Sequence, residues 1–110
     1  VTFHYIISEP DAGSIIHQSV PKLEYGDTIH DVACKAVISG SNDIVELLKI
    51  FERDRKWKTF VQRGTGKNFL ERDFRAEHLK VIYDLYDDKI VDRFLDGTIT
   101  PSNPNLIRQF

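Results

Sequence analysis

The first twenty residues follow the hydrophobic pattern of a β-hairpin. Four β-branched or aromatic residues occupy every second position of the first seven: Val1, Phe3, Tyr5 and Ile7. This period of two predicts a strand over 1–8. Proline, aspartate and glycine between 9 and 13 favour a turn, and a second β-rich run follows over 14–20. The segment therefore predicts two antiparallel strands joined by a tight connection.

From Asp27 onwards the period changes to that of a helix. The first stripe is spaced by three and four: Ile29, Val32, Ala33, Ala36 and Val37. Thr28 with Asp31 three positions later predicts a capping box, and Gly40 predicts the helix end. Ser41 or Asn42 then offers a cap for a second stripe: Ile44, Leu47, Leu48 and Phe51. The pattern predicts two short helices in tandem.

The second half of the chain alternates less regularly. Residues 56–62 read as a third strand, which the glycines of 64–66 interrupt, and 68–70 read as a short returning strand. A long helical stripe then ends at Gly97: Leu79, Ile82, Tyr83, Tyr86, Ile90 and Phe94. Asp87 and Asp88 are the point at which this helix could divide in two. Residues 98–110 predict an extended C-terminal tail.

This order predicts one compact α+β domain over 1–97, with the helices packed on one face of a small antiparallel or mixed sheet. A hairpin followed by a helix that starts Gly26-Asp27-Thr28-Ile29 resembles the opening of ubiquitin-like β-grasp modules. The resemblance covers about the first half of the chain and implies a β-grasp-like topology. The expected core is apolar throughout: Phe3, Tyr5, Ile7, Ile16, Ile29, Val32, Val37, Leu47, Leu48, Phe51, Phe60, Leu79, Ile82, Tyr83, Ile90 and Phe94.

Composition narrows the class of protein. The 110 residues are 41% hydrophobic and 29% charged, which is typical of a single folded globule. The net charge of -2 argues against a general affinity for nucleic acid or anionic membranes, so such binding would need a local patch. No apolar run approaches the length of a spanning helix, about 18 residues, and the N-terminal segment lacks the pattern of a signal peptide.

Cysteine and methionine usage adds two expectations. A single cysteine excludes an internal disulfide, and no Asn-X-Ser/Thr acceptor occurs, which together favour an intracellular protein, cytoplasmic or nuclear. The chain has no methionine and begins at Val1. It is therefore either a chain whose initiator methionine was removed or a piece of a longer polypeptide, and the sequence leaves both open.

The strongest local charge lies in the basic segment, residues 53–67. Six cations oppose only Asp54: Arg53, Arg55, Lys56, Lys58, Arg63 and Lys67. Trp57 and Phe60 are interleaved with them, an arrangement suited to phosphates and stacked bases. The Gly64-Thr65-Gly66-Lys67 turn could add an anion-binding concavity, although it is not a Walker loop. The alternative is a solvated basic face with Trp57 or Phe60 in the core.

An acidic segment over 84–96 contrasts with it. Its carboxylates are Asp84, Asp87, Asp88, Asp92 and Asp96, and the first four are candidates for binding a basic partner. Residues 92–103 imitate part of a calcium loop, but Phe94 and Asn103 stand where oxygen ligands are needed. The sequence predicts no metal site here, and no cofactor.

The histidines offer weaker hypotheses. His4 and His17 lie on the two strands of the predicted hairpin, where facing imidazoles could cleave a phosphodiester by general acid-base catalysis. His30 and Cys34 are four apart on a helix and could contribute to a soft-metal site. The alternatives are ordinary strand residues and a small buried thiol.

Two classes of function follow. We expect a non-enzymatic protein-interaction module or adaptor that uses an exposed sheet edge or its charged faces to bind another protein or a second copy of itself. The alternative is a nucleic-acid or phosphate-binding protein that uses the basic segment. In the catalytic form of this hypothesis, the protein is a nuclease that cleaves RNA with His4 and His17. Membrane binding is not expected.

Overall fold

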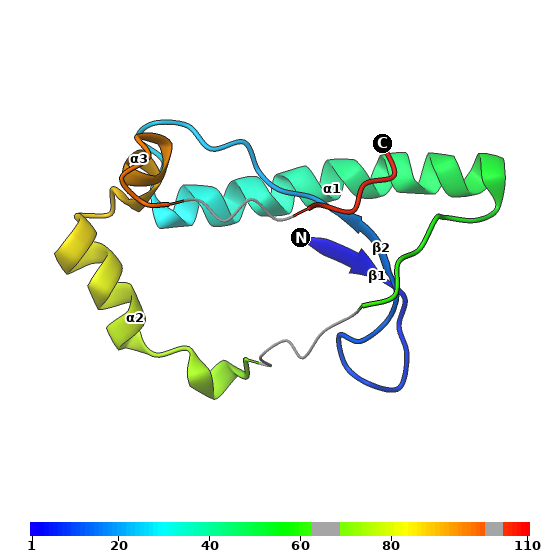
Figure 1. Ribbon diagram of the computed structural model, residues 1–110, viewed down its shortest axis with the longest axis horizontal. Coiled ribbons are helices and arrows are strands. Elements are labelled where there is room, and N and C mark those ends of the chain that lie inside the picture. Colours follow the sequence, from blue (N-terminus) through cyan, green and yellow to red (C-terminus); the bar gives the residue numbers. More distant parts are fainter. Residues whose placement is uncertain (63–68, 101–104) are drawn as a thin grey trace. The chain divides into compact units, whose positions relative to one another are not determined.

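The computed structural model describes residues 1–62, 69–100 and 105–110, and these are mostly helical (Figure 1). The sheet has only two strands, β1 (Thr2–His4) and β2 (Ile15–Gln18), which pair antiparallel. The helical elements are α1 (Ile29–Asp54), the 3₁₀ turn η1 (Glu71–Asp73), α2 (Ala76–Lys80), the π-helical turn η2 (Val81–Leu85) and α3 (Ile90–Leu95). The predicted α+β class, with a β-grasp-like sheet covered by helices, is therefore wrong.

One long helix replaces the two short helices predicted before residue 54. α1 runs for 26 residues straight through Gly40. The predicted start is confirmed, because Thr28 and Asp31 form reciprocal hydrogen bonds: the Thr28 N–H donates to the Asp31 carboxylate at 2.9 Å and the Asp31 N–H donates to the Thr28 hydroxyl at 3.3 Å. Gly40 does not end the helix, since an interior glycine costs only about 1 kcal/mol.

The predicted long C-terminal helix is broken into short pieces. α2, η2 and α3 have five, five and six residues. The break before α3 lies at Asp87 and Asp88, whose φ angles of 51° and 50° are left-handed and interrupt a right-handed helix. The long helix of the chain is thus α1, in the middle of the sequence.

The predicted third strand contributes one bridge. Within 56–62, only Phe60 pairs with β2, through an isolated antiparallel bridge to Ile15. Phe69 and Leu70 form no strand, and residue 68 and the glycines of 64–66 lie outside the described residues.

Few apolar side chains are buried. In the described part of the chain, the buried apolar side chains are those of Ile16, Leu47 and Val91. Of the core residues predicted from the sequence, several are exposed: Tyr5, Ile7, Val37, Leu48, Phe51, Phe60 and Tyr83. A sheet of two short strands is too narrow to cover a helix of 26 residues.

The chain divides into two compact units, which we describe separately. Unit 1 holds residues 1–21, 34–62 and 105–110, with both strands, most of α1 and the C-terminal segment. Unit 2 holds 22–33 and 69–100, with the start of α1 and the short helices. The sequence-based assignment of 1–97 to one domain stays a prediction. No described helix is long and apolar enough to cross a lipid bilayer.

Candidate functional site

Strand β1 presents an open backbone edge. Val1 and Ser19 exchange two hydrogen bonds, from the Ser19 N–H at 2.8 Å and from the Val1 amino group at 2.7 Å. In an antiparallel pair such bonded positions alternate with positions whose backbone groups point away from the partner strand. The N–H and C=O of Thr2 therefore point away from β2, and no backbone group of the described chain outside the two strands engages them.

His4 repeats this arrangement. The Tyr5 N–H donates to the Ser14 carbonyl at 3.1 Å, so Tyr5 faces β2 and His4 faces away from it. The register changes between Phe3, which pairs with His17, and His4, which pairs with Ile15. The additional residue, Ile16, lies on β2, so β1 keeps a regular edge with two outward donors and two outward acceptors.

Two shallow depressions lie between β1 and α1. The larger, about 600 Å³, is lined by Thr2, Phe3, His4, Tyr5, Ile6, Ile16, Ile44, Leu47 and Trp57. The smaller, about 320 Å³, is lined by Val1, Phe3, Val37, Gly40, Ser41 and Ile44. Phe3 and Ile44 belong to both. Neither lining contains an acid, a lysine or an arginine, so this surface, which we call the β1 groove, favours uncharged side chains.

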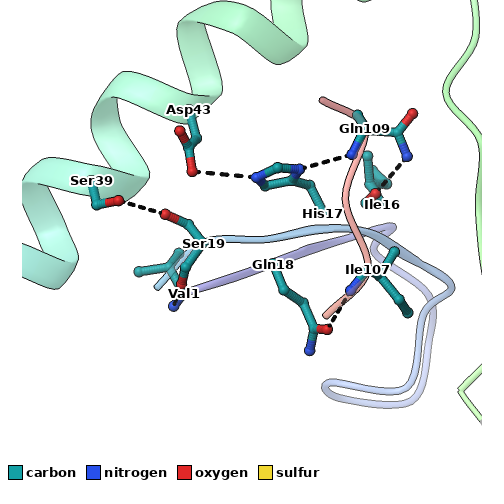
Figure 2. Close-up of polar contacts among 9 residues, drawn as sticks. All are labelled: Val1, Ile16, His17, Gln18, Ser19, Ser39, Asp43, Ile107 and Gln109. Carbon is teal, nitrogen blue, oxygen red and sulfur yellow. Dashed lines mark hydrogen bonds and ion pairs between the residues drawn. The ribbon is translucent and has the colours of Figure 1, made fainter. Parts of the chain in front are cut away.

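The other edge of the sheet, the outer edge of β2, is already covered. The Gln18 N–H donates to the Ile107 carbonyl at 2.8 Å, and the Ile107 N–H donates to the Gln18 side chain at 3.0 Å (Figure 2). Ile15 and Phe60 exchange two backbone bonds at 2.8 and 2.9 Å. The Gln109 side-chain amide donates to the Ile16 and Lys58 carbonyls, both at 2.7 Å. The outer edge of β2 is thus occupied by the C-terminal segment and by residues near 60.

His17 anchors this covering segment. Its side chain has no exposed surface and lies between Asp43 of α1 and the Gln109 backbone (Figure 2). The Gln109 N–H donates to Nδ1 at 3.1 Å, so Nε2 carries the proton and donates to the Asp43 carboxylate at 3.3 Å. Phe110 stacks on the imidazole with ring centroids 4.6 Å apart. Beside it, the Ser19 and Ser39 hydroxyls are hydrogen-bonded at 2.8 Å and join β2 to α1.

The two hairpin histidines have different partners. His17 pairs across the sheet with Phe3, whose ring lies 6.1 Å from the imidazole. His4 approaches the Tyr5 carbonyl through Nδ1 at 3.0 Å and the Asp11 carboxylate through Nε2 at 3.6 Å. Because both nitrogens of His17 are bonded inside the fold, its lone pair and its proton are already used. This geometry favours a structural role for His17 over general acid-base catalysis.

The basic segment folds back on the end of α1. Trp57 is half-buried, donates its indole N–H to the Leu47 carbonyl at 2.8 Å, and packs against Phe51 with ring centroids 4.6 Å apart. A depression of about 480 Å³ beside it is lined by Ile50, Arg53, Asp54, Lys56, Trp57, Lys58 and Gln109. Arg53 donates to the Asp54 carboxylate at 2.7 and 2.9 Å, and this hydrogen bond lowers the pKa of Asp54.

Two other residues of the basic segment, Arg55 and Phe60, do not line this depression. Arg55 is exposed in a left-handed conformation with φ of 57°, and Phe60 is half exposed. Arg63 and Lys67 lie outside the described residues, as does the glycine-rich turn. The structure therefore brings three of the predicted cations, Arg53, Lys56 and Lys58, to one depression with Trp57.

The acidic segment binds backbone groups of its own unit. Asp88 accepts the Ile29 N–H at 3.0 Å and Asp92 accepts the Gly26 N–H at 2.7 Å. Asp96 accepts the Tyr25 hydroxyl at 2.9 Å, and this hydrogen bond raises the pKa of Tyr25. Asp84 pairs with Lys80, and Asp87 lies 3.5 Å from Lys89. Asp88, Asp92 and Asp96 thus order the turn before α1 in unit 2.

His30 and Cys34, the candidates for a soft-metal site, do not form a common cluster of ligands. His30 shares a 2.9 Å hydrogen bond with the Tyr83 hydroxyl, and Cys34 is exposed, contrary to the alternative of a buried thiol. No group of three or more potential ligands with metal-site geometry occurs among the described side chains.

Sequence reasoning missed the polar network around His17. The sequence pattern does not distinguish Asp43, Ser39 or Gln109, since each is an ordinary polar residue far from the hairpin in sequence. The spacing of Ser39 and Asp43, four apart on a helix that also carries Gly40, is the one signal that they share a face.

Comparison with known proteins does not assign the chain to a group. No family model, curated protein or solved structure matches it.

Proposed function

We propose that the protein is a non-enzymatic interaction module that binds an extended protein segment by adding it as a strand to the edge of β1. The observation that carries this proposal is the pair of outward residues, Thr2 and His4, whose backbone groups bond to no backbone group of the described chain outside the two strands. An extended backbone is the ligand that satisfies such a row of alternating donors and acceptors.

The β1 groove supports the same mode of binding. In strand addition the main chain gives affinity, while depressions beside the edge select alternate side chains. The depressions flank β1, and their linings carry no acidic, lysine or arginine side chain. The bound segment should therefore carry uncharged apolar residues at every second position.

Burial of exposed apolar surface on α1 would favour binding. Val37 is 66% exposed, Ile44 38% and Leu48 55%. A strand added beside β1 would widen the sheet over this stripe and remove apolar surface from water, at about 25 cal/mol per Å². The groove thus offers both hydrogen bonds and hydrophobic burial to one ligand.

A synthetic peptide of alternating valine and threonine tests the proposal. We expect it to shift the amide resonances of Thr2 and His4 and to slow their hydrogen exchange. Thr2→Pro should abolish binding, because it removes an N–H that the fold itself does not use, whereas Thr2→Ala keeps this N–H and should bind normally. Binding that survives Thr2→Pro, or an absence of binding to the unchanged chain at a concentration at which it is monomeric, would refute peptide addition at β1.

The basic depression supports a second candidate, binding of nucleic acid or another phosphate. Arg53, Lys56 and Lys58 surround it with Trp57 at its wall, although Asp54 neutralises part of the charge. Short RNA and DNA titrated across a salt series should quench Trp57, the only tryptophan, with affinity that falls as salt rises. Lys56→Ala with Lys58→Ala should remove the response, and Lys49→Ala, on α1 beside Glu46, should not. Unchanged binding in the double variant would end this candidate.

A further inference from the structure

We infer that the strand bound at β1 is the β1 of a second copy of this chain, so that two molecules form a continuous four-stranded antiparallel sheet. This inference rests on the proposed function. It adds the identity of the partner and the register in which the two edges meet.

The edge is complementary to itself. In a two-fold antiparallel arrangement centred on Phe3, Thr2 of each copy lies opposite His4 of the other. Both are outward-pointing positions, so each such pair exchanges two hydrogen bonds, and the two pairs use all the outward donors and acceptors of both strands. A register centred on Thr2 or on His4 alone would pair fewer of these groups.

The side chains also match. The residues of one copy that flank the groove, Val1, Phe3 and Tyr5, alternate along an uncharged strand, which is the ligand that the groove favours. Val1 and Tyr5 are 49% and 43% exposed, and in this register each lies opposite the other residue of the second copy. Phe3 meets its equivalent at the axis, where opposed side chains approach most closely.

Electrostatics permit the pairing. β1 contains no acid, lysine or arginine, and His4 faces Thr2 of the second copy instead of a second imidazole. No like charges are therefore placed opposite one another across the new pair of strands.

The association closes on itself. The outer edge of β2 is covered by Phe60 and by the C-terminal segment, with Ile107 bonded to Gln18 and Gln109 bonded to His17. Sheet growth through β1 therefore stops at four strands and gives a symmetric dimer instead of an open filament. The same contact covers the apolar α1 stripe of both copies at once.

Sedimentation equilibrium of the full chain over a wide concentration range tests the inference. We expect a reversible monomer–dimer equilibrium, which Thr2→Pro weakens at least about tenfold, or about 1.4 kcal/mol. Thr2→Ala is the matched control and should dimerise as the unchanged chain does. Circular dichroism of both variants is the control for folding, and we expect their helical spectra to match that of the unchanged chain.

Cysteine cross-linking tests the register with different substitutions. In a Cys34→Ser background, Thr2→Cys mixed with His4→Cys should form a disulfide-linked dimer faster than either variant alone, since paired strand positions fall within disulfide reach. A chain that is monomeric at every concentration, a dimer unaffected by Thr2→Pro, or preferential linking of Thr2→Cys to itself would overturn the inference. Peptide binding at β1 by a strictly monomeric chain would overturn it while leaving the proposed function intact.

Discussion

His17 connects three parts of unit 1, since Asp43 and the Gln109 backbone hold its two nitrogens and Phe110 stacks on its ring. Asp43→Ala would leave the buried Nε2–H without its acceptor. We expect the free energy of unfolding to fall by about 1–3 kcal/mol, the usual cost of an unsatisfied buried donor. Urea denaturation followed by Trp57 emission measures this change.

Asp43→Asn provides the control, because its side-chain oxygen still accepts a hydrogen bond from Nε2–H. This variant should lose less stability than Asp43→Ala. If Asp43→Ala were as stable as the unchanged chain, the hydrogen bond would contribute nothing to the fold.

Tyr25 carries a pH dependence in unit 2. Its hydrogen bond to Asp96 raises its pKa above the ordinary value of 10.0. A raised pKa in the folded state means that the contribution to stability is complete below pH 10 and is lost as the pH rises through the folded pKa. Asp96→Asn should lower the pKa of the Tyr25 hydroxyl. Absorbance titration of phenolate formation measures this pKa, and subtracting the titration of the Tyr25→Phe variant isolates the signal of Tyr25. An unchanged transition would contradict the role of Asp96.

Residue roles could be predicted where the partners lie nearby in sequence. Thr28 and Asp31, three apart, form the expected capping box. The partner of His17, Asp43, is 26 positions away, and the Gln109 backbone is 92 away. Contacts of that kind depend on tertiary folding, which hydrophobic period and local spacing do not encode.

At the scale of elements, α1 approaches the residue before β1 closely at Gly40. A Cβ added there would lie 3.2 Å from the Val1 side chain. Gly40→Ala should gain about 1 kcal/mol in helix propensity and lose a comparable amount through this contact, so its net effect is small. In a Val1→Gly background, which also removes the Val1 Cβ that would lie 3.3 Å away, the same substitution should stabilise the chain by about 1 kcal/mol.

Thermal and urea unfolding of the four chains gives the coupling energy between the two positions directly. Additive effects would show that Val1 and Gly40 do not constrain one another. This contact also explains why the sequence misled at this point: the glycine permits close approach of a strand, a role that resembles a helix end when only local signals are available.

Strands were harder to predict than the start of α1. The alternation over 1–20 does correspond to the paired strands β1 and β2, whereas the equally alternating 56–62 supplies one bridge at Phe60. Alternation describes a side-chain pattern, but a strand also requires a neighbour along its length, and β2 offers its outer edge to the C-terminal segment as well.

On the scale of the whole molecule, stability depends on few residues. Leu47 is 1% exposed, and a fully buried leucine replaced by alanine typically costs about 2–5 kcal/mol. Small domains often have only about 5–15 kcal/mol in total. We therefore expect Leu47→Ala to remove a large share of the free energy of unfolding, seen as loss of helical circular dichroism at a lower urea concentration than in the unchanged chain. Leu48→Ala, at a position 55% exposed, should leave the helix intact, and equal effects would refute this sparse core.

The covering of β2 by residues 105–110 has a consequence for biosynthesis. The ribosome delivers the hairpin first and the C-terminal segment that covers the outer edge of β2 about ninety residues later, so a nascent chain carries two open strand edges instead of one. At about 5–20 residues per second this interval lasts several seconds. Throughout that time neighbouring chains on one message could join at either edge, and a chaperone that shields extended apolar segments would have its greatest effect before Gln109 is made.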